Sequence, residues 1–299
     1  MPFPRPGAEG AERPARVDAH QHVWDLSVRD QPWLTEAGMA PIHRSFAMAD
    51  LVPAAAVARV TRTILVQVLP DLRETTEFLA LAADSDLIGG VVGWMDLTRP
   101  DVAELLAALR ALPGGDRLVG VRHLVQSEPD PGWLVRADVR RGLRAVGAAG
   151  LCYDLLTLPR QLPAAVDAAR ALPETTFVLD HLSKPPIASG ALEPWATRIR
   201  ELAAEPNVSC KLSGMVTEAD RASWTVAALR PYADTAVEAF GPGRVMFGSD
   251  WPVCLLAASY AEVVAAADEL LAGLAPAEQD EVFGGTAARV YRLAESGGR

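Results

Sequence analysis

The sequence contains few cysteines and no long uninterrupted hydrophobic run. Its three cysteines, Cys152, Cys210 and Cys254, are far apart and odd in number. They therefore supply neither a CxxC pair nor a disulfide framework. Every apolar run is broken by Arg, Asp or Gly before it reaches the roughly 20 residues that cross a bilayer. We expect a cytoplasmic protein that works in a reducing compartment and has no membrane partner.

Basic residues are in the minority, and lysine is almost missing. The chain has 28 basic and 38 acidic residues, which gives a formal net charge of −10, and Lys184 and Lys211 are its two lysines. Non-specific binding to nucleic acid requires a basic face, so we expect no nucleic-acid partner. The chain also lacks the GxGxxG sequence of dinucleotide-binding folds and the phosphate-binding P-loop. We expect no organic cofactor.

What the 299 residues do contain is enough apolar sequence, 50%, for a large core. Short β-branched runs alternate with longer Ala/Leu-rich runs, a rhythm typical of repeated βα units around a parallel sheet. Eight strands are predicted, at 16–20, 63–68, 87–95, 118–124, 150–155, 176–181, 208–212 and 244–248. Helices are predicted at about 48–60, 71–83, 101–112, 137–149, 160–172, 192–204, 221–240, 259–273 and 276–293.

Eight strands, each followed by a helix, are the count of an α/β protein of the (β/α)8 TIM-barrel type, which needs about 250 residues. The helix at 276–293 is then an extra C-terminal element. We predict one barrel domain over residues 16–299, preceded by a disordered leader at 1–15 that lacks the apolar core of a signal peptide. A doubly wound open sheet is the alternative, but its first strand would normally lead into a glycine-rich turn.

Polar residues gather where the predicted strands end. The carboxyl ends of barrel strands carry the active site in such enzymes, and buried strands otherwise have apolar sequences. Burying so many polar groups is unfavourable unless they have partners or a function, so the pattern favours an enzyme. The residues in question are His20, Gln21, His22, Gln67, Trp94, Asp96, Arg122, His123, Tyr153, Asp154, Asp180, His181, Lys184, Lys211, Ser249, Asp250 and Trp251.

His20, His22 and Asp250 carry the sharpest chemical hypothesis. Two residues apart on a strand, the two imidazoles point to the same side. They can ligate a metal or hydrogen-bond a substrate carbonyl, or simply pack in the core. Asp250 follows an apolar strand that stops abruptly. It is either a helix N-cap or a general base that activates water.

The remaining strand-end residues have both structural and functional interpretations. Only one of Arg122 and His123 can point inward, and an inward Arg122 suits a carboxylate, an oxyanion or an ion pair. A buried Lys211 needs a partner, whether structural or catalytic. Tyr153 and Asp154 are candidates for substrate contact or for support behind the site.

Two further groups complete these expectations. We expect Asp180 to face the helix layer or to cap a loop. Trp24, Trp33 and Trp94 fall near strand ends or loops, where they either stack on a sugar ring or pack in the core.

Several segments resemble one family. The sequence resembles the L-fuconolactone hydrolase group in the "amidohydrolase 2" branch of the amidohydrolase superfamily, from residue 16 almost to the end. The matching segments are VDAHQHVWD (17–25), QPWL (31–34), GVRH (120–123), YDLL (153–156), LDHLSKP (179–185), KLSG (211–214), FGSDWP (247–252) and FGGTAARVY (283–291). In the last of them, Gly285 and Thr286 stand where the family pattern has Thr-Asn.

The resemblance implies a distorted barrel that hydrolyses a small lactone, with L-fuconolactone and L-rhamnonolactone as leading substrates. Its catalytic set maps onto His20, His22, His181 and Asp250. Alternatives within the branch are amide hydrolysis, lactone isomerisation, a zinc-dependent decarboxylase or a lactonase for dicarboxylates of the muconolactone type. A third hypothesis is a barrel that binds a small acid or sugar without turnover. We expect a monomer or a homodimer.

The metal content implied by the resemblance is at most one ion. His20, His22 and Asp250 would hold a single divalent ion such as zinc, with His181 as a further ligand, or the enzyme works without one. The sequence departs from the two-metal pattern of the superfamily in two places. Strand four ends in Arg122 and His123 instead of a bridging Lys or Glu, and strand five offers Asp154 instead of His.

Overall fold

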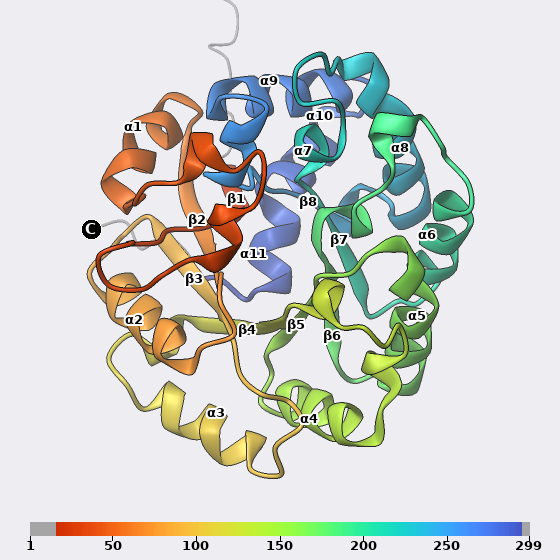
Figure 1. The fold of residues 1–299 in the computed structure, drawn as a ribbon. Helices are drawn as coiled ribbons and strands as arrows, with labels where there is room; N and C mark the ends of the chain where they lie inside the picture. The colour runs from red at the N-terminus through yellow and green to blue at the C-terminus, as the bar shows by residue number, and fades with distance from the viewer. Residues whose placement is uncertain (1–15, 295–299) are drawn as a thin grey trace, which may run out of the picture.

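Eight parallel strands form one sheet in the order β1 to β8 (Figure 1). The computed structural model describes residues 16–294, so the expected leader at 1–15 lies outside the described residues. All eight predicted strands are present, and the (β/α)8 barrel is confirmed. The strands are β1 Arg16–Gln21, β2 Val60–Val66, β3 Ile88–Gly93, β4 Leu118–His123, β5 Cys152–Leu155, β6 Thr176–Leu179, β7 Val208–Leu212 and β8 Val245–Phe247.

Helices surround the sheet, as the apolar periodicity predicts. They are α1 Met48–Val57, α2 Leu72–Ala83, α3 Val102–Arg110, α4 Ala137–Ala148, α5 Leu162–Ala171, α6 Trp195–Ala203, α7 Met215–Glu218, α8 Val226–Phe240, α9 Tyr260–Leu270, α10 Pro276–Asp280 and α11 Thr286–Val290. The predicted start of α8 at residue 221 is wrong. Thr225 caps α8 by accepting the N–H of Ala228 at 3.2 Å, whereas the Asp220 carboxylate closes a preceding turn. The short α7 was not predicted, because its four residues are too few to show the 3.6-residue periodicity of apolar side chains that indicates a helix.

The predicted C-terminal helix is divided. A five-residue π-helical segment, Glu281–Gly285, separates α10 from α11. Helix α11 lies at the centre of the barrel in the view of Figure 1, and Ala287 and Tyr291 pack into the cluster of side chains inside the strands. The Tyr291 hydroxyl donates to the Asp154 carboxylate at 2.8 Å. The amino-terminal end of the barrel is therefore filled.

The barrel closes between β1 and β8 without a regular ladder. Among the described residues, a single bridge there pairs Gln21, the last residue of β1, with Trp251 in the loop after β8. The backbone N–H of Asp250 donates to the His20 carbonyl at 2.9 Å, and the N–H of His22 donates to the Trp251 carbonyl at 2.7 Å. This seam is the distortion of the barrel, and it brings His20, His22 and Asp250 together.

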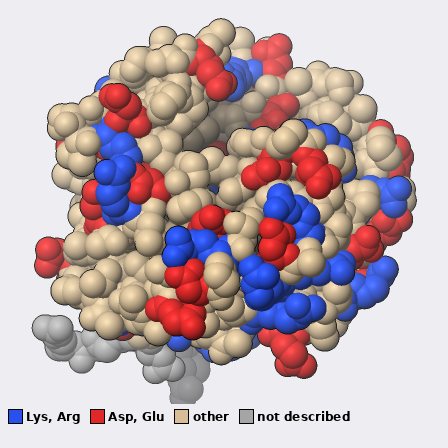
Figure 2. Space-filling model, turned by 60° about the horizontal axis from the view of Figure 1, so that its bottom comes forward, with Lys and Arg blue, Asp and Glu red and all other residues tan. Residues whose placement is uncertain are grey.

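The outer surface is charged but mixed. Figure 2 shows acidic and basic side chains next to one another on one face. Surface ion pairs include Arg99–Asp101 and Arg136–Asp138, near α3 and α4. Within residues 16–294, none of the helices has the length and apolar composition of a membrane-spanning segment.

A glycine on α4 tests how closely the helix layer packs. A Cβ at Gly142 would lie 2.3 Å from the Leu97 carbonyl oxygen. Alanine is about 1 kcal/mol better than glycine in an exposed helix interior. Here we expect Gly142→Ala to lower the free energy of unfolding by about 1–3 kcal/mol, because the backbone of the β3–α3 loop must move. Gly273→Ala, with no atom within 4 Å of its new Cβ, is the control. Denaturant unfolding measures both, and a Gly142→Ala variant as stable as the parent would contradict this packing.

Candidate active site

A cavity of about 480 Å³ opens at the carboxyl ends of the strands. His22, Arg122, His181 and Asp250 contribute to its lining, together with Trp24 and Trp33 from the loop after β1. The loops after β6 and β7 add Lys184, Thr217, Glu218 and Arg221. Its size and its mixture of aromatic and polar groups suit a small polar ligand.

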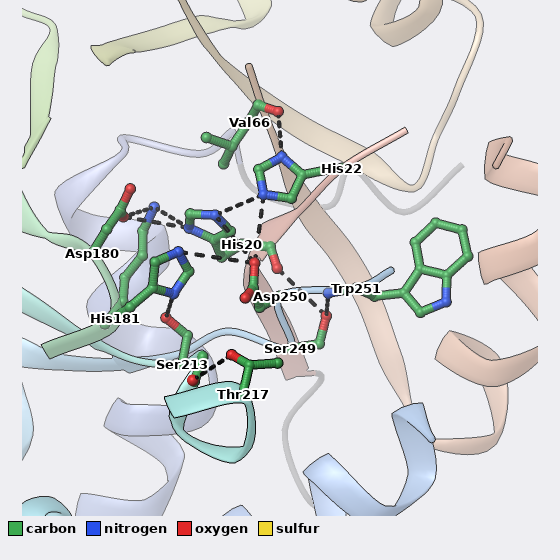
Figure 3. A network of polar contacts seen from close by, with 12 residues as sticks. His20, His22, Val66, Asp180, His181, Ser213, Thr217, Ser249, Asp250 and Trp251 are labelled. Carbon is green, nitrogen blue, oxygen red and sulfur yellow. Dashed lines mark hydrogen bonds and ion pairs between the residues drawn. The ribbon is translucent and has the colours of Figure 1, made fainter. Parts of the chain in front are cut away.

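Three imidazoles surround the Asp250 carboxylate (Figure 3). Asp250 Oδ1 lies 3.5 Å from His22 Nε2, 3.8 Å from His20 Nε2 and 3.9 Å from His181 Nε2. His20 Nε2 and His22 Nε2 are 3.1 Å apart. His22 Nδ1–H donates to the Val66 carbonyl at 2.8 Å, which leaves Nε2 of neutral His22 with its lone pair toward this centre.

Left-handed backbone places two of these side chains. Asp250 has φ 58°, and the four residues from His181 to Lys184 have φ between 52° and 59°. Each such non-glycine residue costs roughly 1–2 kcal/mol, and consecutive ones persist only where packing holds them. The Ser213 hydroxyl lies 2.9 Å from His181 Nδ1 and holds the imidazole in place. The imidazole also approaches Gly214 closely. A Cβ at Gly214 would lie 2.7 Å from His181 Nδ1, so glycine is required there.

Asp18 ties β1 to the loop after β8. One carboxylate oxygen accepts the backbone N–H of Ser249 at 2.8 Å and that of His20 at 3.2 Å. The other accepts the Tyr260 hydroxyl at 3.1 Å. Burial raises the pKa of Asp18 to about 6, although the bonds from Ser249, His20 and Tyr260 oppose the shift. The carboxylate fixes His20 relative to the residue that precedes Asp250.

A layer of buried ion pairs lies beneath the histidines. Lys211 Nζ contacts Asp154 at 2.6 Å, Asp180 at 2.9 Å and His20 Nδ1 at 3.2 Å. Arg122 donates to Asp180 at 3.0 Å and to Gln67 at 2.8 Å. The expectation that Asp180 faces the helix layer is wrong, since its carboxylate points into the barrel and lies between these two cations. Both acids compensate charges that could not otherwise be buried.

His20 and His181 are neutral at neutral pH. Burial lowers the pKa of His181 to about 4, and it also lowers the pKa of His20 well below its ordinary value despite the nearby Asp180. Burial opposes ionisation of Asp250, but His181, His22 and His20 together hold its pKa below the ordinary range. Asp250 is therefore the anion of the centre. Its side chain does not cap a helix, because the following turn, Val253–Leu256, has no side-chain cap.

The structure separates the predicted site residues into three groups. His22, His181, Asp250, Arg122, Trp24 and Trp33 line the cavity. His20, Asp154 and Lys211 are completely buried beneath it. The third group, His123, Tyr153 and Trp94, lies outside the cavity.

The residues of the third group are occupied elsewhere. His123 stacks on Trp133 with ring centroids 4.3 Å apart and contacts Glu128 at 2.7 Å, and Trp94 Nε1 donates to His123. Tyr153 is completely buried and packs against Phe177. Arg122 and His123 alternate as predicted, and Arg122 is the one that points inward.

Sequence inspection missed several polar residues around the cavity. Asp18 precedes the histidine pair by two residues on the same strand, so its direction could have been inferred from strand alternation. Glu218 ends α7, and Thr217 and Arg221 flank it, but nothing in the sequence there distinguishes a loop over the site from an ordinary surface turn. Tyr291 comes from the C-terminal helix, far from any strand end.

The donor set fits one divalent cation. His20, His181 and Asp250 each offer a ligand atom within 4.8 Å of the others, and His22 Nε2 lies beside them. Two ligands about 2.1 Å from a tetrahedral zinc ion are about 3.4 Å apart, close to the separations seen here. A second ion would meet Arg122 and Lys211, whose positive charges lie beside His20. These residues therefore suit a single ion.

Comparison with known proteins identifies the family. A sequence profile described as "Amidohydrolase" matches residues 17–293, almost the whole chain. This chain belongs to the amidohydrolase family. Among curated relatives of this amidohydrolase, an L-fucono-1,5-lactonase of Burkholderia multivorans is 42% identical over 292 residues, which cover 94% of this chain and 97% of the relative. An L-fucono-1,5-lactonase of Burkholderia ambifaria is 37% identical and covers 93% and 96%.

A solved structure agrees with the amidohydrolase fold. The crystal structure of an amidohydrolase from Burkholderia multivorans with bound zinc superimposes with a TM-score of 0.89. The two sequences are 41% identical, and the match covers 94% of this chain and all of that one.

The role of Asp18 can be tested by two substitutions. Asp18→Ala removes the acceptor of two buried backbone N–H groups, and we expect it to lower the free energy of unfolding by about 2 kcal/mol or more and kcat by more than about tenfold. Asp18→Asn keeps an oxygen for both N–H groups, so we expect kcat within about threefold of the parent. Thermal unfolding and steady-state kinetics measure the pair. A kcat of Asp18→Ala within about threefold of the parent would show that this carboxylate does not position the site.

Proposed function

We propose that this amidohydrolase opens the ring of a sugar-derived aldonolactone of the L-fuconolactone or L-rhamnonolactone type. The observation that carries the proposal is the ionised Asp250 carboxylate at the floor of the cavity, within 4 Å of three imidazoles. A carboxylate in this position can accept a proton from water beside a bound carbonyl. The names of its relatives at 42% and 37% identity support the choice of a sugar lactone.

Asp250 is the base in this mechanism. It takes one proton from water while the water oxygen forms a bond to the lactone carbonyl carbon, and the carbonyl π electrons move to the oxygen. The positive charge of Arg122, which lines the cavity, stabilises the negative charge that develops on that oxygen. The tetrahedral intermediate then collapses, and the bond from carbon to the ring oxygen breaks.

The leaving oxygen needs a proton. Neutral His181, with a pKa of about 4, is a poor source at neutral pH. Protonated Asp250 therefore returns the proton to the alkoxide, and the product is the open hydroxy acid, which ionises and releases one proton to the solvent. Trp24 and Trp33 form an aromatic wall for one face of the sugar ring.

A single divalent ion fits this proposal without being required by it. His20, His22, His181 and Asp250 would hold the ion, which when bound would polarise the carbonyl and lower the pKa of nearby water. Arg122 supplies positive charge at the same wall.

The cellular setting is also part of the proposal. Cys152, Cys210 and Cys254 are buried and free, which supports a reducing cytoplasm. The protein would act as a monomer or homodimer with a small lactone as its partner.

Substitution of the base gives the most direct test. Asparagine in place of Asp250 keeps the shape of the side chain and tolerates a left-handed backbone, but it cannot take a proton. We expect Asp250→Asn to lower kcat at least about a hundredfold on a panel of aldono-1,4- and 1,5-lactones, assayed with a pH indicator after subtraction of spontaneous hydrolysis. Asp280→Asn, at an exposed acid on α10, is the matched control. Activity of Asp250→Asn within about threefold of the parent would exclude Asp250 as the base.

The metal content gives a second test. We expect elemental analysis of purified protein to find at most one metal per chain, because Arg122 and Asp154 replace the residues that would complete a two-metal site. Activity should survive chelation at least in part. Two equivalents of metal per chain, with activity lost on removal and restored on re-addition, would contradict this interpretation of β4 and β5.

A further inference from the structure

Two cations of the cavity, Arg122 and Lys184, already have acidic partners. Arg122 directs Nε and Nη2 to Gln67, and Nη1 to Asp180 and His20. It therefore presents no free pair of N–H groups for the two-pronged contact that a carboxylate prefers. Lys184 is paired with Glu218, 3.8 Å away. Among the described residues that line the cavity, Arg221 is the cation without an ion pair, and it is exposed.

Acceptors, in contrast, are available. Glu218 ends α7 and lines the cavity together with Glu36 and Thr217. Its side chain is 28% exposed, and its carboxylate lies beyond hydrogen-bonding distance of Lys184 Nζ. An ionised carboxylate only accepts hydrogen bonds, and the hydroxyl groups of a sugar are suitable donors. Burial raises the pKa of Glu218, and Lys184 and Arg221 oppose the shift while Asp250 reinforces it.

We propose that Glu218, oriented by Lys184, accepts a hydrogen bond from a ring hydroxyl of a sugar lactone and so selects lactones that carry this hydroxyl over analogues that lack it. This inference rests on the proposed function and adds the substrate group that the site recognises. Lys184 belongs to the same left-handed turn as His181, so the turn that places an imidazole beside Asp250 also places the partner of Glu218. The turn therefore fixes the position of the group that binds the substrate hydroxyl relative to Asp250.

The energetic consequence follows from the charge of the acceptor. A hydrogen bond to a charged group contributes about 1.5–3 kcal/mol, which corresponds to roughly a 10- to 150-fold change in kcat/KM. A site built to bind a hydroxyl also discriminates strongly against the analogue that lacks it, because its polar group is left unpaired. The loss should therefore depend on which substrate hydroxyl is present.

The experiment is a double-mutant cycle between protein and substrate. The parent enzyme and Glu218→Ala are assayed on L-fucono-1,5-lactone and on deoxy analogues that each lack one ring hydroxyl. We expect Glu218→Ala to lower kcat/KM for the full lactone about 10- to 100-fold. For one deoxy analogue, which the parent hydrolyses correspondingly slowly, the substitution should change kcat/KM by less than about twofold. Glu238→Ala, at an exposed glutamate on α8, is the control, and thermal unfolding verifies the fold of each variant.

The outcomes separate the two proposals. If the parent hydrolyses no sugar lactone, the proposed function fails and this inference falls with it. If the parent is active but Glu218→Ala lowers kcat/KM equally for every analogue, or for none, this inference alone is overturned. Should Glu218→Ala fail to fold, Glu218→Gln is used in the same cycle, since it keeps the length of the side chain but removes its charge. Its loss of kcat/KM for the full lactone must then exceed its loss for one deoxy analogue, and equal losses would overturn this inference.

Discussion

The Asp18 carboxylate joins the first strand of the barrel to the loop after the last one, where no backbone ladder does so. By accepting the N–H groups of His20 and Ser249, it fixes the distance between the histidine pair and Asp250. The bonds from Asp250 N–H to the His20 carbonyl and from His22 N–H to the Trp251 carbonyl complete this seam. The imperfect closure of the barrel is thus what brings the reactive groups together, and the stability of the seam and the geometry of the site cannot be separated.

Beneath the seam, the interior of the barrel contains buried ion pairs at a level where barrel interiors are usually filled by apolar side chains. Lys211 and Arg122 are each held by buried acids, and Asp180 contacts both. Burying one such charge without a partner is unfavourable. Removal of one partner would leave the other charge buried and unpaired, which lowers the free energy of unfolding by several kcal/mol. Lys211 contacts the imidazole of His20, and Asp18 accepts the backbone N–H of the same residue. His20 is thus fixed at both its side chain and its backbone.

The barrel could be predicted from the sequence because its signals are local and repeated. Eight apolar β-branched runs separated by amphipathic ones leave few other folds, and His20, His22, His181 and Asp250 stand at the ends of those runs. What could not be predicted depends on direction and distance. His123 and Tyr153 alternate with inward residues and so pack away from the cavity, while Asp180 turns inward because its backbone leaves the strand.

Loops gave the weakest sequence signals. The division of the C-terminal helix and the contact of Tyr291 with Asp154 arise from packing against residues more than a hundred positions away. The short α7 that carries Glu218 has too few residues for any periodicity. Its placement becomes clear only when the left-handed turn at His181 and the glycine beneath it are seen together.

Because α11 and Tyr291 fill the amino-terminal end of the barrel, the interior of the described chain offers no passage through the molecule. A lactone that enters the cavity covers the same floor from which the attacking water must come. That water is then already in place beside Asp250 when the lactone arrives, or it enters past the bound ring at the rim. The open acid must likewise leave by the mouth it came through before the next water and lactone can take their places. Lactone, water and product therefore all exchange through the same mouth of the cavity.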